Sequence, residues 1–227
     1  MNRHVAIQEV GFAIYPAVFS GDLVDHLLRD LEGLAAIRSR AGVRHALRFA
    51  PVERVARTAE MMDLAREVLG PHAFPFRATL LDKSPDSNWL VVWHQDTALP
   101  LQTRLNLPGW GPWSVKEGID YAHAPADALH QVLALRVSLD DSTLDNGPLR
   151  VLPKTHTIGV LSDDRIHELS QTIAPVECAC PKGGIVAMKP LTVHASSKSA
   201  SEGPRRVLHI EYAASASIAE PLQLAIA

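Results

Sequence analysis

The pattern of hydrophobic and polar positions divides the chain into a helical first third and a β-rich remainder. After Ser20, the apolar residues recur at helical spacing: Leu23, Val24, Leu27, Leu28, Leu31 and Leu34. This spacing predicts an amphipathic helix with Ser20 as its N-cap. A strand is expected before it, over residues 8–16, and a second helix after it, over residues 55–69, where Gly70 and Pro71 provide a stop signal.

From residue 74 onward the apolar segments become short and rich in β-branched residues. They predict strands over residues 74–83, 89–94, 131–139, 149–152, 185–188, 191–194 and 205–212, separated by Pro, Gly, Asp or Asn. Helices followed by strands, with little alternation, favour an antiparallel sandwich over a Rossmann-type sheet. We therefore predict a mainly β (α+β) fold, a jelly-roll core with N-terminal helices packed outside.

The same pattern predicts one domain over residues 1–227. Its helical part covers about 1–72, its jelly-roll core about 73–215, and a long insertion interrupts the core at about 97–128. Loops of this length are usually functional or disordered. Trp110, Trp113 and Lys116 lie in it, so we consider two interpretations: a lid or substrate pocket, and a loop whose tryptophans are buried for packing.

Composition limits the possible partners. The chain has 47% apolar residues, 21% charged residues and a net charge of −3, values typical of a soluble globular protein with no attraction for nucleic acid. No stretch approaches the roughly 18 uninterrupted apolar residues of a membrane span, and no secretory pattern is present, so we expect a cytoplasmic protein without a membrane partner. Cys178 and Cys180 are expected to be small apolar strand residues. The oligomeric state is left open.

The candidate chemistry begins at His94 and Asp96, which follow an apolar run. Residues two apart on a strand point to the same face, so both side chains can bind one metal ion. His194, at the end of another β-branched stretch, offers a third ligand. Two histidines and one carboxylate leave open coordination positions, as in non-haem Fe(II) oxygenases. A second such pair, His209 and Glu211, is the weaker candidate because no histidine follows it.

Arg205 provides a cation for a substrate or co-substrate. A strand, a polar turn and an antiparallel strand would return the chain from His194 to the metal, with Arg205 at the head of the second strand. The guanidinium could then bind the distal carboxylate of a 2-oxo diacid. Ser196, on the same strand face as His194, could add a hydroxyl bond.

Taken together, these motifs resemble the phytanoyl-CoA dioxygenase family of Fe(II)- and 2-oxoglutarate-dependent oxygenases. The resemblance is carried by Gly11-Phe12, Trp93-His94-Gln95-Asp96, Asp145-Asn146-Gly147-Pro148-Leu149, Leu152-Pro153-Lys154-Thr155-His156, His194-Ala195-Ser196 and Arg205-Arg206. It implies a double-stranded β-helix (cupin-like) core. His94, Asp96 and His194 would be the iron ligands, and Arg205 with Ser196 would bind 2-oxoglutarate. We nominate Lys83 as the further polar group that the family often places on an early strand.

The implied reaction uses Fe(II), 2-oxoglutarate and O2 to hydroxylate, or otherwise oxidise, an unactivated carbon of a small organic molecule, releasing succinate and CO2. Asp96 favours hydroxylation, because related halogenases have a small residue at that place. Two other classes stay open. The same ligands could serve a divalent-metal hydrolase or isomerase on a cupin-like barrel. The histidines could also be hydrogen-bonded residues of a non-catalytic jelly-roll binding protein.

Overall fold

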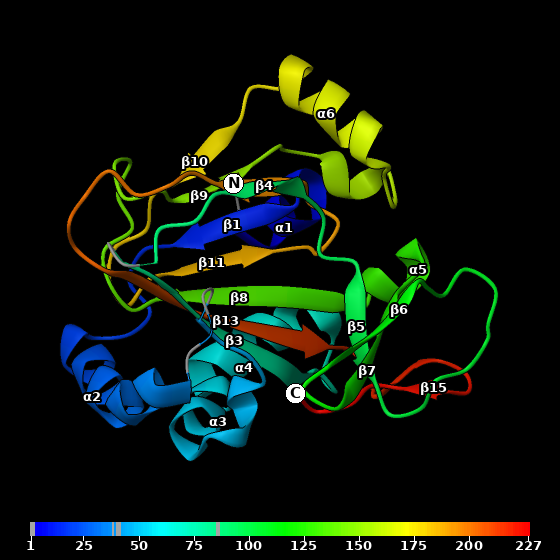
Figure 1. The fold of residues 1–227 in the computed structure, drawn as a ribbon, viewed down its shortest axis with the longest axis horizontal. Helices are drawn as coiled ribbons and strands as arrows, with labels where there is room; N and C mark the ends of the chain where they lie inside the picture. Colours follow the sequence, from blue (N-terminus) through cyan, green and yellow to red (C-terminus); the bar gives the residue numbers. More distant parts are fainter. Residues whose placement is uncertain (1–2, 38, 40–41, 85–86) are drawn as a thin grey trace.

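Two antiparallel sheets form the centre of the molecule (Figure 1). The structure, a computed structural model, describes residues 3–37, 39, 42–84 and 87–227. The larger sheet has the order β1 (Phe12–Tyr15), β11 (Ile185–Met188), β8 (Val132–Ser138), β13 (Arg205–Ala213), β3 (Phe74–Lys83) and β2 (Gly42–Val43). The smaller sheet has the order β10 (Val176–Cys178), β9 (Leu149–Val151), β12 (His194–Ser196) and β4 (Val91–His94). The chain crosses repeatedly between the sheets, so the predicted jelly-roll core is confirmed.

Helices cover the outer face of the larger sheet. α2 (Gly21–Leu31), α3 (Ala50–Ala56) and α4 (Ala59–Leu69) gather on one side of it in Figure 1. Their apolar faces pack in one cluster with outward side chains of the sheet, among them Leu133, Leu208 and Tyr212. The Ser20 hydroxyl accepts a hydrogen bond from the Leu23 amide at 3.3 Å, so the predicted N-cap is confirmed.

Two boundaries differ from the predictions. The strand expected over residues 8–16 forms only at β1 (Phe12–Tyr15), because residues 8–10 are the end of a helix, α1 (Arg3–Val10). Gly11 separates them at φ +93°, and a Cβ there would lie 2.6 Å from the Thr192 hydroxyl. The helix expected over residues 55–69 is two helices, because the backbone of Thr58 is extended and starts α4 as its N-cap.

The insertion over residues 97–128 is folded, so the prediction of a long loop was wrong. It contains a small sheet of β5 (Ala98–Leu101), β7 (Ile119–His123) and β6 (Trp113–Lys116), followed by α5 (Ala126–Leu129). Its apolar side chains pack in a cluster with the C-terminal β14 (Ser217–Ala219) and β15 (Leu222–Gln223). The segment is therefore ordered by a second apolar cluster, which also includes Phe76, Val132 and Ala213 of the larger sheet.

The remaining helix, α6 (Asp163–Thr172), lies at the other end of the molecule (Figure 1), where Ile166 and Leu169 pack against Trp93 of β4. The short helices η1 (Glu32–Ile37), η2 (Ala46–Arg48) and η3 (Thr155–Thr157) connect these elements. None of the helices in the described ranges is long and apolar enough to cross a lipid bilayer.

Strand alternation directs a set of polar side chains into the interior between the two sheets. β13 pairs with β3 so that Arg205 faces Lys83, His209 faces Thr79 and Glu211 faces Arg77. On its other edge it pairs with β8, where His209 faces Arg136. The intervening residues, such as Leu208 and Ile210, belong to the outer apolar cluster. Odd-numbered residues of β13 therefore point inward.

The predicted hairpin between the strands of His194 and Arg205 does not form. β12 begins only at His194, because residues 189–192 form a turn with the Thr192 amide bonded to the Lys189 carbonyl at 3.0 Å. β12 belongs to the smaller sheet and β13 to the larger one. Arg205 therefore approaches Ser196 across the space between the sheets and not along a ladder.

Candidate active site

Three side chains from two segments that are far apart in the sequence meet on the inner side of the smaller sheet. β12 pairs with β4 so that His194 lies directly opposite His94, with ring centroids 4.2 Å apart. Asp96 follows β4, and its carboxylate oxygens lie 3.6 Å from His94 Nε2 and 3.5 Å from His194 Nε2. One ligand atom from each residue lies within 4.8 Å of the other two, which is close enough to hold one metal ion.

The histidine tautomers suit metal binding. Nδ1 of His94 lies 2.8 Å from the Val92 carbonyl, and Nδ1 of His194 lies 2.9 Å from the Thr192 carbonyl. A carbonyl can only accept, so each Nδ1 carries the proton and each Nε2 keeps a free lone pair toward Asp96. Burial lowers the pKa of His194 to about 4, so this ring is neutral at pH 7. The residues present therefore fit a divalent transition metal.

Gln95 holds this segment in place from its other face. Its side-chain amide donates to the Leu191 carbonyl at 2.7 Å and to the Gly159 carbonyl at 2.9 Å, and accepts from the Leu161 amide at 2.9 Å. The side chain is 8% exposed, so it ties the strand before Asp96 to the chain that leads to His194. It positions two metal-binding segments relative to each other.

Replacing Gln95 with leucine is expected to lower the free energy of unfolding by about 1–3 kcal/mol, because buried backbone groups lose their partners. Urea denaturation measures this loss, and titration with Fe(II) should show weaker metal binding. The matched control is Gln102→Leu, since Gln102 is exposed and makes one such bond, to the Leu224 carbonyl at 3.1 Å. Equal stability of the two variants would contradict the assignment.

Buried cations gather beside the histidines and the carboxylate. Arg205, Lys83 and Arg136 are 5%, 1% and 8% exposed. Arg205 bonds to the Ser196 hydroxyl at 3.3 Å and to the Asn146 carbonyl at 3.2 Å, and Lys83 bonds to the same hydroxyl at 2.9 Å. Arg136 lies 2.7 Å from Nδ1 of His209. Among the described residues none of the three has a carboxylate within ion-pairing distance.

The pKa values of Lys83 and Arg205 are lowered, as expected for buried cations that have no carboxylate partner among the described residues. Burial, followed by the charges of Arg205 and Arg136, lowers the pKa of Lys83 to about 8. Burial, followed by the charge of Arg136, lowers the pKa of Arg205 to about 10. Burying unpaired cations is costly, so the arrangement favours an anionic ligand that supplies the negative charge. Arg206, the neighbouring cation, instead pairs with Asp140 at 2.7 Å.

The turn at Asn146 and Gly147 orients two of these anion-binding groups. The Asn146 carbonyl accepts from Arg205, and the Gly147 carbonyl accepts from the Ser196 hydroxyl at 2.8 Å. Gly147 has φ +70°, and a Cβ there would lie 2.3 Å from the Ser197 carbonyl, which itself accepts a bond from Lys83. The turn thus needs glycine for its backbone angle and for the close approach of Ser197.

Gly147→Ala is therefore expected to cost at least about 1–2 kcal/mol of folding stability from its left-handed backbone alone, and to weaken binding of a dicarboxylate as Ser197 is displaced. Thermal unfolding and equilibrium binding of 2-oxoglutarate test both effects. Gly203→Ala is the control, because Gly203 has no atom within 4 Å of an added Cβ. An alanine at residue 147 that changed neither quantity would refute this role of the turn.

The opposite end of the interior holds a compensated ion pair. Arg77 bonds to the Glu211 carboxylate through two nitrogens and donates to the Ala98 carbonyl at 2.7 Å. Its guanidinium lies 5.7 Å from the centroid of the Tyr121 ring, and the Tyr121 hydroxyl lies 2.9 Å from Nε2 of His45. This set connects the larger sheet to the insertion and to the N-terminal helical region.

One cavity of about 240 Å³ connects these features. It is lined by His94, Asp96, His194, Ser196 and Arg205 of the predicted set and by Lys116 of the insertion. Lys83 lies behind Ser196. Trp110 and Trp113 do not line the cavity and pack instead against the apolar cluster that orders the insertion. Their position favours packing over substrate contact.

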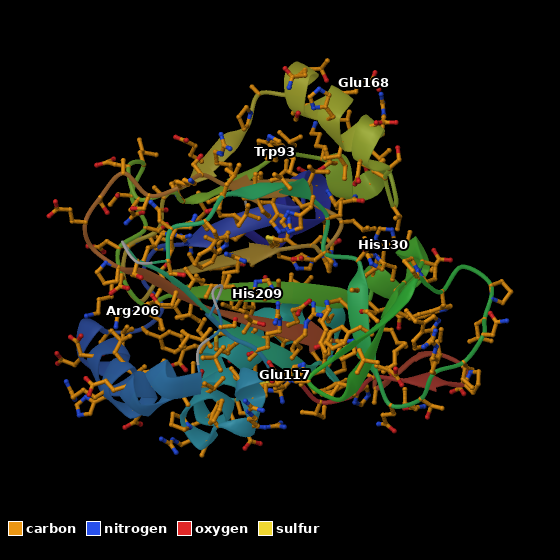
Figure 2. All side chains as sticks on the ribbon, in the orientation of Figure 1. Trp93, Glu117, His130, Glu168, Arg206 and His209 are labelled. Carbon is orange, nitrogen blue, oxygen red and sulfur yellow. The ribbon has the colours of Figure 1, made fainter. Side chains whose placement is uncertain are left out.

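Sequence reasoning missed several cavity residues. Arg77, Arg136 and Tyr121 were not singled out, and His209 with Glu211 was set aside, yet all five line the cavity. Figure 2 shows His209 near the centre of the molecule, on β13. A signal did exist, because β8 and β13 are otherwise almost wholly buried and apolar. A charged residue at an alternate position of such a strand indicates a polar interior.

Comparison with known proteins agrees with this geometry. A family model described as phytanoyl-CoA dioxygenase (PhyH) matches residues 7–207. An L-proline trans-4-hydroxylase of Streptomyces griseoviridis is 28% identical over 210 residues, which cover 80% of this chain and 69% of that protein. The region matched by the family model includes all the residues that form the metal-binding cluster.

Solved structures share the fold. EctD from S. alaskensis, with 2-oxoglutarate and 5-hydroxyectoine, has a TM-score of 0.69 at 20% identity, with 92% of this chain and 74% of that chain covered. The epimerase SnoN, in complex with Fe3+, alpha ketoglutarate and nogalamycin RO, has a TM-score of 0.72 at 19% identity, with 93% of this chain and 82% of that chain covered. At these identities the structures establish the double-stranded β-helix architecture.

Proposed function

From the premise that this chain belongs to the phytanoyl-CoA dioxygenase family of Fe(II)- and 2-oxoglutarate-dependent oxygenases, we propose that it hydroxylates an unactivated carbon of a small organic metabolite. His94, Asp96 and His194 bind the iron. Arg205, Ser196 and Lys83 bind the distal carboxylate of 2-oxoglutarate. When bound, Fe(II) with 2-oxoglutarate and O2 supplies oxidative decarboxylation, which releases CO2 and succinate and oxidises the substrate carbon.

The observation that carries the proposal is the pairing of two sites in one cavity. A neutral His194 and a carboxylate point at the same space as His94, and beside them lie three buried cations that have no carboxylate partner among the residues the structure describes. A dianion that chelates a metal at one end and carries a free carboxylate at the other satisfies both sites. A zinc hydrolase or an apolar binding protein has no need of the uncompensated cations.

The residues of the chain fix the co-substrate and limit what else reaches the metal. Ser196 accepts from Lys83 and Arg205, and its own hydroxyl donates to the Gly147 carbonyl, so the carboxylate-binding groups are positioned before a ligand arrives. The carboxylate of Asp96 occupies the place where a halide would bind in a halogenase, so hydroxylation, or a reaction that begins with hydrogen abstraction such as desaturation or epimerisation, is the expected outcome.

The proposal extends to domain organisation and compartment. We treat residues 1–227 as one oxygenase domain, with residues 97–128 closing one side of the cavity through Lys116 and Tyr121. We infer a cytoplasmic location, in which the thiols of Cys178 and Cys180 would stay reduced.

Incubation of the purified protein with Fe(II), O2 and 2-oxoglutarate tests the function. Succinate should form slowly without a substrate and faster when the right metabolite is present. L-proline is a reasonable first addition, given the activity of the curated relative. Activity that needs Zn(II) and is independent of 2-oxoglutarate would instead indicate the hydrolase class. If the protein shows neither activity, the remaining class is the non-catalytic jelly-roll binding protein.

A further inference from the structure

The cavity carries more positive charge than its metal and co-substrate sites require. Among the described residues that line it, five are cationic, Arg44, Arg77, Lys116, Arg136 and Arg205, and two are carboxylates, Asp96 and Glu211. Under the proposed function, Fe(II) adds two positive charges and 2-oxoglutarate adds two negative ones. The excess of three positive charges therefore remains after both have bound.

This excess does not come from the Arg77–Glu211 ion pair at the Tyr121 end of the cavity. The charge of Arg77 is offset by Glu211, to which it is doubly bonded. Arg205 lies at the end where 2-oxoglutarate would bind, and Arg136, which contacts His209, lies between the two ends, where the charge of Asp96 acts on it. Two cations are left, Lys116 and Arg44, and within the described ranges neither has a carboxylate within ion-pairing distance.

Lys116 and Arg44 lie at the other end of the cavity from Arg205. The register of β13 places Glu211 and its partner Arg77 six residues beyond Arg205, which is roughly 20 Å at 3.3 Å per residue. The Lys116 ammonium lies 4.5 Å from the centroid of the Tyr121 ring, the same ring that Arg77 approaches. A five-carbon diacid held at Arg205 is too short to reach this ring.

Arg44 belongs to the same end. It precedes His45, whose ring is fixed by its contact with the Tyr121 hydroxyl at 2.9 Å. Arg44 itself is exposed at the cavity mouth, whereas Lys116 is half-buried. One cation thus lies inside the mouth and one at its rim, an arrangement that attracts an anion and then partly desolvates it.

We propose that the substrate carries a carboxylate, and that Lys116 binds it at the Tyr121 end of the cavity with Arg44 at the rim. This inference rests on the proposed function, because it assigns the second ligand of the same cavity. The bound carboxylate supplies the counter-charge that Lys116 lacks. Burial, together with the charges of Arg77 and Arg44, lowers the pKa of Lys116, and a carboxylate contact would raise it again.

This arrangement fixes the distance between the substrate carboxylate and the carbon that is oxidised. The carboxylate is held beside Tyr121, whereas oxidation takes place beside His94 and Asp96. Metabolites are then selected by the separation between their carboxylate and the carbon that is oxidised. Neutral analogues of the same skeleton, such as primary amides, lose the contact with Lys116 and should be poor substrates.

Acetate, a small carboxylate that carries methyl protons, is the probe for this site. Protein loaded with Mn(II) and saturating 2-oxoglutarate is titrated with acetate, and paramagnetic relaxation of the acetate methyl protons reports binding near the metal. Saturating 2-oxoglutarate keeps acetate out of the Arg205 site.

The variants Lys116→Gln and Arg44→Gln should each raise the apparent dissociation constant for acetate, and the increase for Lys116→Gln should be about tenfold. Lys116→Arg keeps the positive charge and should largely preserve acetate binding. Lys154→Gln, at an exposed lysine remote from the cavity, is the matched control.

The outcomes separate this inference from the proposed function. If wild-type protein forms succinate from 2-oxoglutarate but Lys116→Gln and the control bind acetate equally, the carboxylate site is refuted and the oxygenase stands. If the methyl protons of acetamide relax as strongly as those of acetate, the carboxylate site is refuted as well. If wild-type protein neither forms succinate nor binds Mn(II), the proposed function fails and the inference fails with it. If acetate binding is weakened in Lys116→Gln but not in the control, and is largely preserved in Lys116→Arg, the carboxylate site is supported.

Discussion

Asp96→Ala is expected to abolish iron-dependent turnover. Asp96 is the one carboxylate of the cluster, and its oxygens lie between the two histidine Nε2 atoms. Burial alone would raise the pKa of this carboxyl, but its contacts with His194 and His94 outweigh that effect and hold the pKa well below its ordinary value, so the group is ionised and ready to bind a cation. Loss of an outer-shell partner of a metal ligand costs about 10–100-fold, so loss of the ligand itself should exceed that range.

Two measurements check this result: iron bound per chain after anaerobic loading, and succinate released from 2-oxoglutarate. Asp63→Ala is the control, because Asp63 is a highly exposed carboxylate on α4. Both measurements should fall together in Asp96→Ala, while the melting temperature stays close to that of the wild type. Normal iron binding and succinate release in Asp96→Ala would refute the metal site.

Arg205→Ala is expected to weaken 2-oxoglutarate binding strongly and to affect the rate at saturation much less. Arg205 is buried, and its side chain points into the cavity beside Ser196 and Lys83. Removing one partner of a buried, hydrogen-bonded charge pair costs about 2–5 kcal/mol, which is roughly thirtyfold or more in the dissociation constant. Lys83 and Ser196 remain, so some affinity should persist.

The adjacent Arg206 offers a matched control within the same strand. Its guanidinium bonds to Asp140 at 2.7 and 2.8 Å, so Arg206→Ala removes a similar side chain outside the cavity. The apparent KM for 2-oxoglutarate should rise in Arg205→Ala and stay near the wild-type value in Arg206→Ala. The reverse pattern would move the co-substrate anchor from residue 205 to residue 206.

The local parts of the fold and of the site were accessible from sequence. The N-cap at Ser20, the span of β3 and the start of β13 agree with the structure, because each depends on residues adjacent in the chain. The boundaries that differ lie where tertiary contacts decide. Gly11 ends a helix because His156 and Thr192 approach it closely, and both are more than a hundred residues away.

The interior polar residues were harder to predict for the same reason. Arg77, Arg136 and His209 are single residues on three strands, and no local motif joins them. They face one cavity only because β3, β13 and β8 pair in one register, and a shift of one residue would turn them toward the helices. The pair His209 and Glu211 was discounted on sequence, yet it lines the cavity and completes the Arg77 ion pair.

By itself, the sequence determined the chemistry that local spacing can encode: a histidine and a carboxylate two residues apart, and a histidine, serine and arginine in one short segment. The tertiary structure decided which of eleven histidines meet, which of two adjacent arginines faces inward, and that the insertion contributes Lys116 and not its tryptophans. The physical reason is that pairing register and sheet-to-sheet packing are set by the whole core. Side chains a hundred residues apart become neighbours only when that core has formed.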